Sequence, residues 1–130
     1  MEFVYIIGIG VLIAAFTGLS DALPSKYRKR SCMGKSWRLA FPDSSKGNIR
    51  DFLVMFTDSF AFSPDDKLKF SPSDKVLEIY RELYPSKWLP DALEVETLAE
   101  EFEKRYQVKF STLWHEDLTL GELYAGAKNT

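Results

Sequence analysis

Apolar residues recur at steps of three and four along most of the chain, the spacing that places side chains on one face of an α-helix. The first such run covers residues 48–60, with Ile49, Phe52, Leu53, Phe56 and Phe60 on the shared face. A segment with two prolines and several turn residues follows, and it predicts a loop of about ten residues. The pattern therefore predicts a first helix over 48–60 and a break after it.

A second helix is predicted over 71–84. Ser71 is a suitable N-cap, Pro72 suits the first helical position, and Asp74 suits the positive end of the helix. Pro85 would end the helix. Its apolar face is Val76, Ile79, Tyr80, Leu83 and Tyr84.

Two capping boxes predict the starts of the remaining helices. Asp91 and Glu94 open a helix over 91–106, and Thr119 and Glu122 open a short last helix that reaches about residue 127. The buried sides of these two helices are Val95, Leu98, Phe102 and Tyr106 in the first, and Leu120, Leu123 and Tyr124 in the second. Residues 107–110 alternate between polar and apolar and favour a short extended run.

The N-terminus has a different pattern, because residues 3–19 carry no charge. As a helix this stretch would span about 26 Å, and an extension to Leu23 would reach about 32 Å, close to the hydrocarbon thickness of a bilayer. Pro24 would stop the helix. The cluster of Lys26, Arg28, Lys29 and Arg30 follows at once, as is usual on the cytoplasmic side of a membrane helix. We therefore expect a single-pass anchor over residues 1–24, with the rest of the chain in the cytoplasm.

Two other interpretations of this stretch remain open. A cleaved signal peptide would end at a small-residue site such as Ser20-Asp21-Ala22, although Glu2 has the wrong sign for its basic start. A buried core helix is the other alternative, although the stretch lacks a polar stripe.

Charge divides the chain into two parts. Residues 26–50 hold eight Lys or Arg against one acid, whereas residues 51–130 hold nine against sixteen. The basic part, residues 25–47, is interpreted as a juxtamembrane linker whose four clustered cations contact anionic lipid. In it, Trp37, Leu39 and Phe41 alternate with smaller or polar residues and favour a short extended segment. Cys32, the only cysteine, is a candidate for acylation at the membrane.

The acidic remainder, residues 48–130, is predicted to be one all-α domain of about four helices. An α+β fold with strands at 36–41, 67–70 and 107–110 is the alternative. The 15% aromatic content supplies a core of adequate size for so short a chain.

The second half of the chain resembles the acyl carrier proteins over about residues 88–127. The resemblance rests on Asp91-Ala92-Leu93 before an acidic helix, and on the phrase Leu118 to Leu123 (LTLGEL) at the last helix. It implies a small acidic helical bundle with an acidic docking helix. That family attaches phosphopantetheine to the serine of an Asp-Ser-Leu triplet, and here Ala92 occupies that position. The resemblance therefore implies no attached cofactor, unless another serine such as Ser86 has taken over the role.

Catalytic patterns are missing from the sequence. His115 is the only histidine, so a zinc site lacks ligands. A nucleophile activated by histidine would have to recruit His115, and no serine lies in a Gly-x-Ser-x-Gly turn. No glycine-rich phosphate loop is present. The acidic domain disfavours nucleic acid as a partner.

These observations favour a non-catalytic, membrane-anchored interaction module that needs no cofactor. Its partners would be the lipid bilayer and a protein with a basic patch, attracted by the carboxylates of the 91–106 helix. The predicted partner-binding residues are Asp91, Glu94, Glu96, Glu100, Glu101 and Glu103. A working acyl or peptidyl carrier and a small membrane-bound immunity or regulatory protein are the alternatives.

Overall fold

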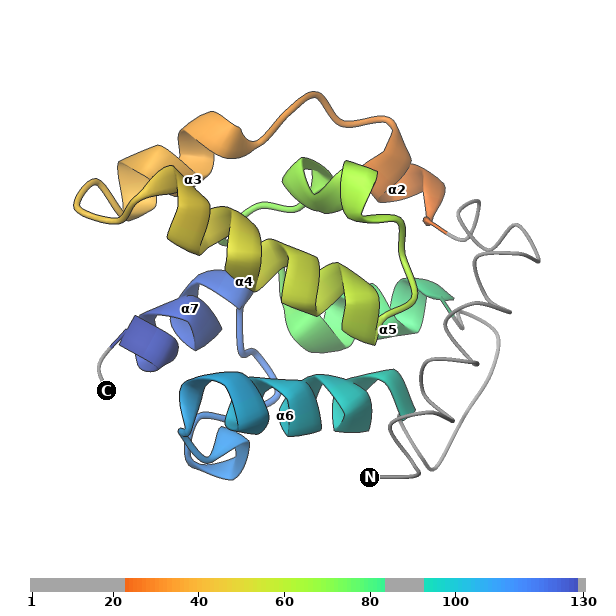
Figure 1. The fold of residues 1–130 in the computed structure, drawn as a ribbon. Coiled ribbons are helices and arrows are strands. Elements are labelled where there is room, and N and C mark those ends of the chain that lie inside the picture. The colour runs from red at the N-terminus through yellow and green to blue at the C-terminus, as the bar shows by residue number, and fades with distance from the viewer. Residues whose placement is uncertain (1–22, 84–92, 129–130) are drawn as a thin grey trace.

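Six α-helices and two 3-10 helices make up the part of the chain that the computed structural model describes, residues 23–83 and 93–128 (Figure 1). In chain order they are α2 (Ser25–Arg28), α3 (Gly34–Ala40), α4 (Lys46–Ser59), η2 (Pro64–Lys69), α5 (Val76–Leu83), α6 (Leu93–Tyr106), η3 (Phe110–Thr112) and α7 (Leu120–Lys128). Among these residues the only strand-like pairing is an isolated antiparallel bridge between Lys75 and Thr119. The predicted all-α class is therefore confirmed for the described residues, and the three strands of the α+β alternative are not found there.

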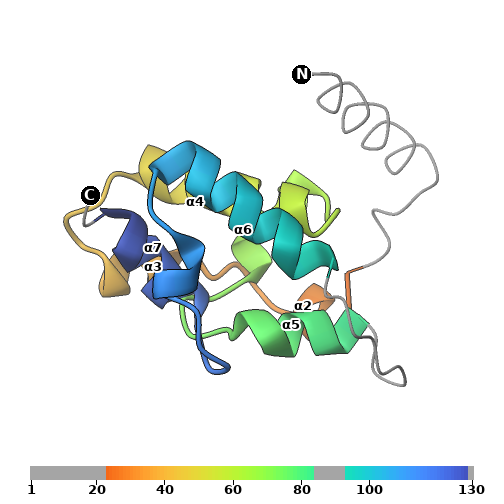
Figure 2. The ribbon, with the colours of Figure 1, turned by 90° about the horizontal axis from the view of Figure 1, so that it is seen from below.

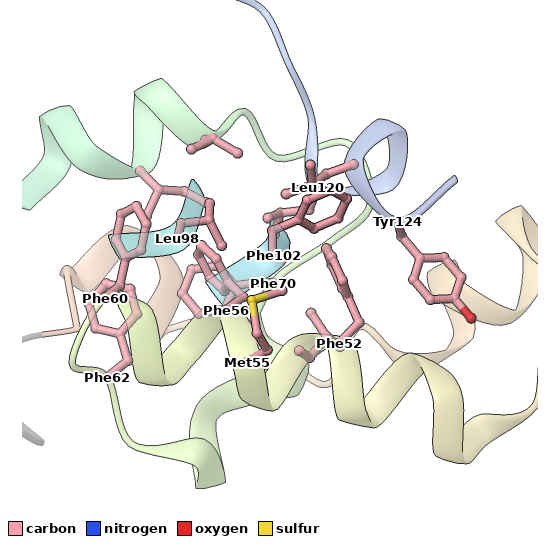
Figure 3. Close-up of a cluster of buried hydrophobic side chains, with 14 of the residues drawn as sticks. Phe52, Met55, Phe56, Phe60, Phe62, Phe70, Leu98, Phe102, Leu120 and Tyr124 are labelled. Carbon is pink, nitrogen blue, oxygen red and sulfur yellow. The ribbon is translucent and has the colours of Figure 1, made fainter. Parts of the chain in front are cut away.

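Helix α4 is the centre of the packing, because it contacts α6 on one side and η2 on another. All five apolar positions that predicted this helix are buried. Figure 3 shows Phe52, Met55 and Phe56 of α4 pointing into a cluster that α6 and α7 complete from the other side. The α6 and α7 members labelled there are Leu98, Phe102, Leu120 and Tyr124.

The loop after α4 joins the same cluster through its aromatic side chains. Phe60, Phe62 and Phe70 are each at most 4% exposed. The rings of Phe56 and Phe70 meet edge to face with centroids 5.0 Å apart, a preferred arrangement for aromatic pairs. The predicted loop thus contains a 3-10 helix, η2, whose two ends are held by buried phenylalanines.

Helix α5 begins later than predicted, at Val76 instead of residue 71. The Asp74 carboxylate accepts a hydrogen bond from the Ser71 N–H at 2.7 Å, which closes a turn over residues 71–74 in place of a first helical turn. The following backbone then pairs with the start of α7, because the Val76 N–H donates to the Leu118 carbonyl and the Leu120 N–H donates to the Asp74 carbonyl. Hydrogen bonds to a distant segment therefore outcompeted the local helix start.

The predicted capping box of the last helix is confirmed. The Thr119 N–H donates to the Glu122 carboxylate at 2.9 Å, and the Glu122 N–H donates to the Thr119 hydroxyl at 3.0 Å. Gly121 lies so close to the Pro72 carbonyl that a Cβ atom would come within 2.9 Å of its oxygen. The start of α7 is thus fixed both by its own cap and by contact with the 71–74 turn.

Replacing Glu122 with alanine should lower the free energy of unfolding at pH 7 by about 0.5–1 kcal/mol, the usual size of a capping interaction. The hydrogen bond from the Thr119 N–H, helped by His115, lowers the pKa of the Glu122 carboxyl. Because the pKa of Glu122 is lower in the folded state than in the unfolded state, its ionised form stabilises the folded state fully at a pH above the ordinary pKa of glutamate. This stabilisation is lost as the pH falls through the lower, folded-state pKa.

Urea unfolding of the full-length chain between pH 7 and pH 3 measures this difference, with Glu116→Ala as the control for an exposed glutamate. We expect the difference in free energy of unfolding between wild type and Glu122→Ala to decrease below pH 4. The decrease should be modest, because solvent screens the exposed carboxylate. A gap that widens on acidification would contradict the assigned cap.

The segment predicted to be a linker is folded onto the domain. Residues 25–47 contain α2 and α3, and Tyr27 and Trp37 are buried at 0% and 1% exposure. The expected extended conformation of residues 36–41 is wrong, because α3 (Gly34–Ala40) is helical and its Trp37 indole N–H donates to the Phe70 carbonyl at 2.8 Å. The aromatic side chains of this segment pack against core residues that are distant in the sequence. Alternation of residues along the chain cannot predict such contacts.

The predicted membrane anchor falls almost entirely outside the described residues. Of residues 1–24 only Leu23 and Pro24 are described, and Leu23 belongs to the buried core at 3% exposure. Within the described ranges no helix has the length and apolar character that a membrane crossing requires. The anchor over residues 1–22 stays a prediction.

Candidate functional site

The predicted acidic surface lies on α6, at the outer edge of the molecule (Figures 1 and 2). Leu98 and Phe102 are fully buried and fix which side of the helix faces α4 and α5. Glu96, Glu100 and Glu103 are exposed on the other side. Glu94 and Glu101 are half-buried, and Asp91 lies outside the described residues.

Two of these carboxylates already have internal roles. Glu103 accepts a hydrogen bond from the Phe110 N–H at 2.9 Å, which ties the end of α6 to η3. Glu101 lies 3.8 Å from the Lys104 ammonium one turn on, a pair that solvent weakens. Within the described residues neither Glu96 nor Glu100 makes an ion pair, so these two are the carboxylates most available to a partner.

Two features enlarge this surface. Leu93, at the described start of α6, is 63% exposed and stands three residues before Glu96 on the same side of the helix. On α4, burial raises the pKa of the Asp58 carboxyl, Arg105 lowers it, and Glu101 raises it further. The Asp58 carboxyl at the end of α4 is therefore close enough to sense the charges of both Arg105 and Glu101 on α6.

The four cations assigned to the membrane surface have different surroundings in the structure. Arg30 forms a two-point pair with Asp74, with Nη–Oδ distances of 2.6 and 2.8 Å. Arg28 donates to the Leu23 carbonyl at 2.8 Å, and Lys26 lies 3.5 Å from Glu78. Lys29 is exposed, and within the described residues it has no ion pair. Contact with lipid by the whole cluster stays a prediction, and Arg30 is the member least available for it.

The Arg30–Asp74 pair joins the N-terminal segment to the turn before α5. Asp74 is only 7% exposed in its side chain, and Arg30 is 22% exposed. Arg30 also lies over the Tyr27 ring at 4.8 Å and donates to the Lys69 carbonyl. The hydrogen bonds that Arg30 donates to the Asp74 carboxylate raise the pKa of the guanidinium, and burial raises the pKa of the Tyr27 hydroxyl, so the charged arginine is held over a neutral phenol.

A basic pocket, which the sequence analysis missed, opens between α3, the first turns of α4, and η2. Lys35 and Arg38 of α3 and Lys46 and Arg50 of α4 supply its charge. Its apolar wall consists of Trp37, Ile49 and Leu68, and its volume is about 210 Å³. The only advance signal was the excess of cations in residues 26–50, of which only the cluster Lys26, Arg28, Lys29 and Arg30 was assigned a role, contact with lipid.

The remaining residues considered in the sequence are a histidine, a cysteine and the alanine at the carrier position. His115 Nε2 lies 3.2 Å from the Glu122 carboxylate, so it joins the α7 cap. In the described part of the chain no three His, Cys, Asp or Glu residues come together as metal ligands would. Cys32 is a free, exposed thiol at the basic pocket. Ala92, the position of the carrier serine in the resemblance, lies outside the described residues.

Comparisons with protein-family models, with curated proteins and with solved structures found no match to this chain. The resemblance to acyl carrier proteins thus stays a prediction.

Proposed function

We propose that this chain is a non-catalytic interaction module held at a membrane, and that the exposed side of α6 binds a basic patch on a partner protein. The observation that carries the proposal is the row formed by Leu93, Glu96 and Glu100. Its two carboxylates have no ion pair within the described residues, and its leucine is 63% exposed. An apolar contact beside unpaired charges is the composition of a transient, electrostatically steered interface.

The proposal includes a likeness to acyl carrier proteins in arrangement and in the use of an acidic helix for docking. It is supported by the order of α4, the acidic α6, and the short η3 and α7, although η2 and α5 lie between α4 and α6. The chain would differ from a working carrier because Ala92 offers no hydroxyl for a phosphodiester. The predicted membrane anchor, limited to residues 1–22 because Leu23 belongs to the core, would bring α6 close to partners that work at the same membrane.

Reversing two charges tests the interface. Glu96→Lys/Glu100→Lys should weaken association with the partner at least about tenfold, because each change replaces an attraction with a repulsion across the interface. The full-length chain, cross-linked in its native membranes, would be analysed by mass spectrometry to identify partners whose cross-links fall on α6. Binding of those purified partners would then be measured at low and physiological salt.

The matched control is Glu82→Lys/Glu116→Lys, which changes the net charge equally at two exposed glutamates outside α6. We expect the control to bind as wild type does, and we expect wild-type affinity to fall as salt rises. A partner that binds the α6 variant and the control equally well would overturn the proposed interface.

A further inference from the structure

We propose that the basic pocket between α3 and α4 is a binding site for a phosphoryl group, of the kind carried by a phosphate monoester. The inference is independent of the partner proposed for α6, because the pocket is formed by different helices and has the opposite charge.

Charge is the first argument for an anionic ligand. Four of the pocket's lining residues are cationic and none of those described is acidic. Within the described residues Lys35, Arg38, Lys46 and Arg50 make no ion pair, whereas Lys26, Arg30, Lys75 and Lys104 elsewhere do. Two arginines and two lysines around one cavity present several N–H donors to a single anion, and guanidinium and ammonium groups are the usual ligands of phosphate.

The position of these cations on their helices is the second argument. Lys46 and Arg50 lie four residues apart at the start of α4, a fourteen-residue helix with no acid in its first turn. Cations near a helix N-terminus oppose the helix dipole, and like charges at this spacing repel each other. Lys35 and Arg38 on α3 add to the same positive field. A bound anion would relieve the repulsion between the two cations and the unfavourable placement of Lys46 in the first turn, so the arrangement favours an anion at this place.

Size and shape limit the ligand. The volume of about 210 Å³ is below the roughly 300–1,000 Å³ of sites that enclose drug-sized molecules. It suits a head group, with the indole of Trp37 and the side chains of Ile49 and Leu68 as an apolar wall. Leu39, 74% exposed and next to Arg38, lies beside the cationic residues of α3. A phosphate monoester of a small alcohol and the head group of phosphatidic acid share this chemistry.

Cys32 provides a probe at the site that needs no engineering. It is the only cysteine of the chain, it is exposed, and it lines the pocket. A ligand in the pocket should slow alkylation of this thiol by iodoacetamide, which intact-mass analysis of the full-length chain measures. The probes are inorganic phosphate, glycerol 3-phosphate, and vesicles of phosphatidylcholine with or without phosphatidic acid, all at the same ionic strength.

The pocket variant is Arg38→Gln/Arg50→Gln. Its control is Arg81→Gln/Lys109→Gln, which removes the same charge at exposed positions outside the pocket. In wild type and control we expect a saturable, at least threefold slowing of alkylation by a phosphoryl ligand. In the pocket variant we expect the ligand concentration that gives half of the maximal slowing to rise at least about tenfold, because two charge-assisted contacts are lost.

Thermal unfolding gives a second readout that a merely structural role would not produce. At the same phosphate concentration the melting temperature should rise by linkage in wild type and control, and should rise much less in the pocket variant. Without phosphate at low salt, the pocket variant should melt at or above the wild-type temperature, because it lacks the repulsion between cations. Melting of the unliganded pocket variant well below wild type would mean that these arginines serve the fold, and would overturn the inference.

A soluble phosphate ester and a lipid head group should give different patterns of Cys32 protection. Protection by glycerol 3-phosphate in solution would identify a soluble ligand. Protection by phosphatidic acid vesicles alone, lost in the pocket variant, would identify a lipid head group. No protection by any probe, or equal protection in the pocket variant and the control, would overturn the site.

Discussion

Replacing Trp37 with alanine should lower the free energy of unfolding by about 3–5 kcal/mol, the cost of removing a large buried aromatic side chain. Trp37 is 1% exposed, its ring packs edge to face on Tyr124 at 6.0 Å, and its indole N–H donates to the Phe70 carbonyl. The substitution leaves a cavity and removes the partner of a buried carbonyl. Urea unfolding of the full-length chain, followed by far-UV circular dichroism, measures the loss.

Leu39→Ala is the matched control, because it shortens a side chain on the same helix that is 74% exposed. It should change stability by no more than about 0.5 kcal/mol. If Trp37→Ala and Leu39→Ala had equal effects, α3 would not be packed on the core, and the basic pocket would lose one of its walls.

Replacing Arg30 with leucine should destabilise the domain by about 2–4 kcal/mol. This value lies between the cost of losing an exposed ion pair and that of breaking a buried one, because Asp74 is nearly buried while Arg30 is partly exposed. The change leaves the Asp74 carboxylate with the Ser71 N–H as a remaining hydrogen-bond donor. It also removes the cation above the Tyr27 ring.

A double-mutant cycle with Arg30→Leu, Asp74→Asn and the combined variant separates the pair from its surroundings. We expect a coupling energy above about 1 kcal/mol. Lys29→Leu removes an exposed cation next to Arg30, and it should cost no more than about 0.5 kcal/mol. An Arg30→Leu variant as stable as Lys29→Leu would show that the segment before α3 is not fastened to the domain.

Local signals in the sequence were sufficient for much of the fold. The spacing of Ile49, Phe52, Leu53 and Phe56 predicted both α4 and its buried face, and all four are in the core. The capping box of Thr119 and Glu122 also formed as predicted. These features depend on residues within a turn or two of one another, so a pattern along the chain contains the information.

The candidate site was predicted less completely, because it depends on contacts between distant residues. The acidic residues of α6 were predicted to bind a partner, and two of them, Glu96 and Glu100, are exposed. The structure adds that Glu103 is used internally, as the acceptor for the Phe110 N–H. The set of carboxylates that is available to a partner therefore depends on the contact between α6 and the segment that follows it.

The sequence by itself determined the all-α class, the apolar faces of the main helices and the separation of basic from acidic residues, because periodicity and composition are local properties. Only the tertiary structure decided that Tyr27 and Trp37 of the predicted linker are buried in the core, that Arg30 is paired with Asp74 forty-four residues away, and that four cations line one pocket. An excess of cations in a sequence is equally compatible with ion pairs, a lipid surface or a ligand site. Packing separates these outcomes, because it alone brings some charges to a partner and leaves others around an open cavity.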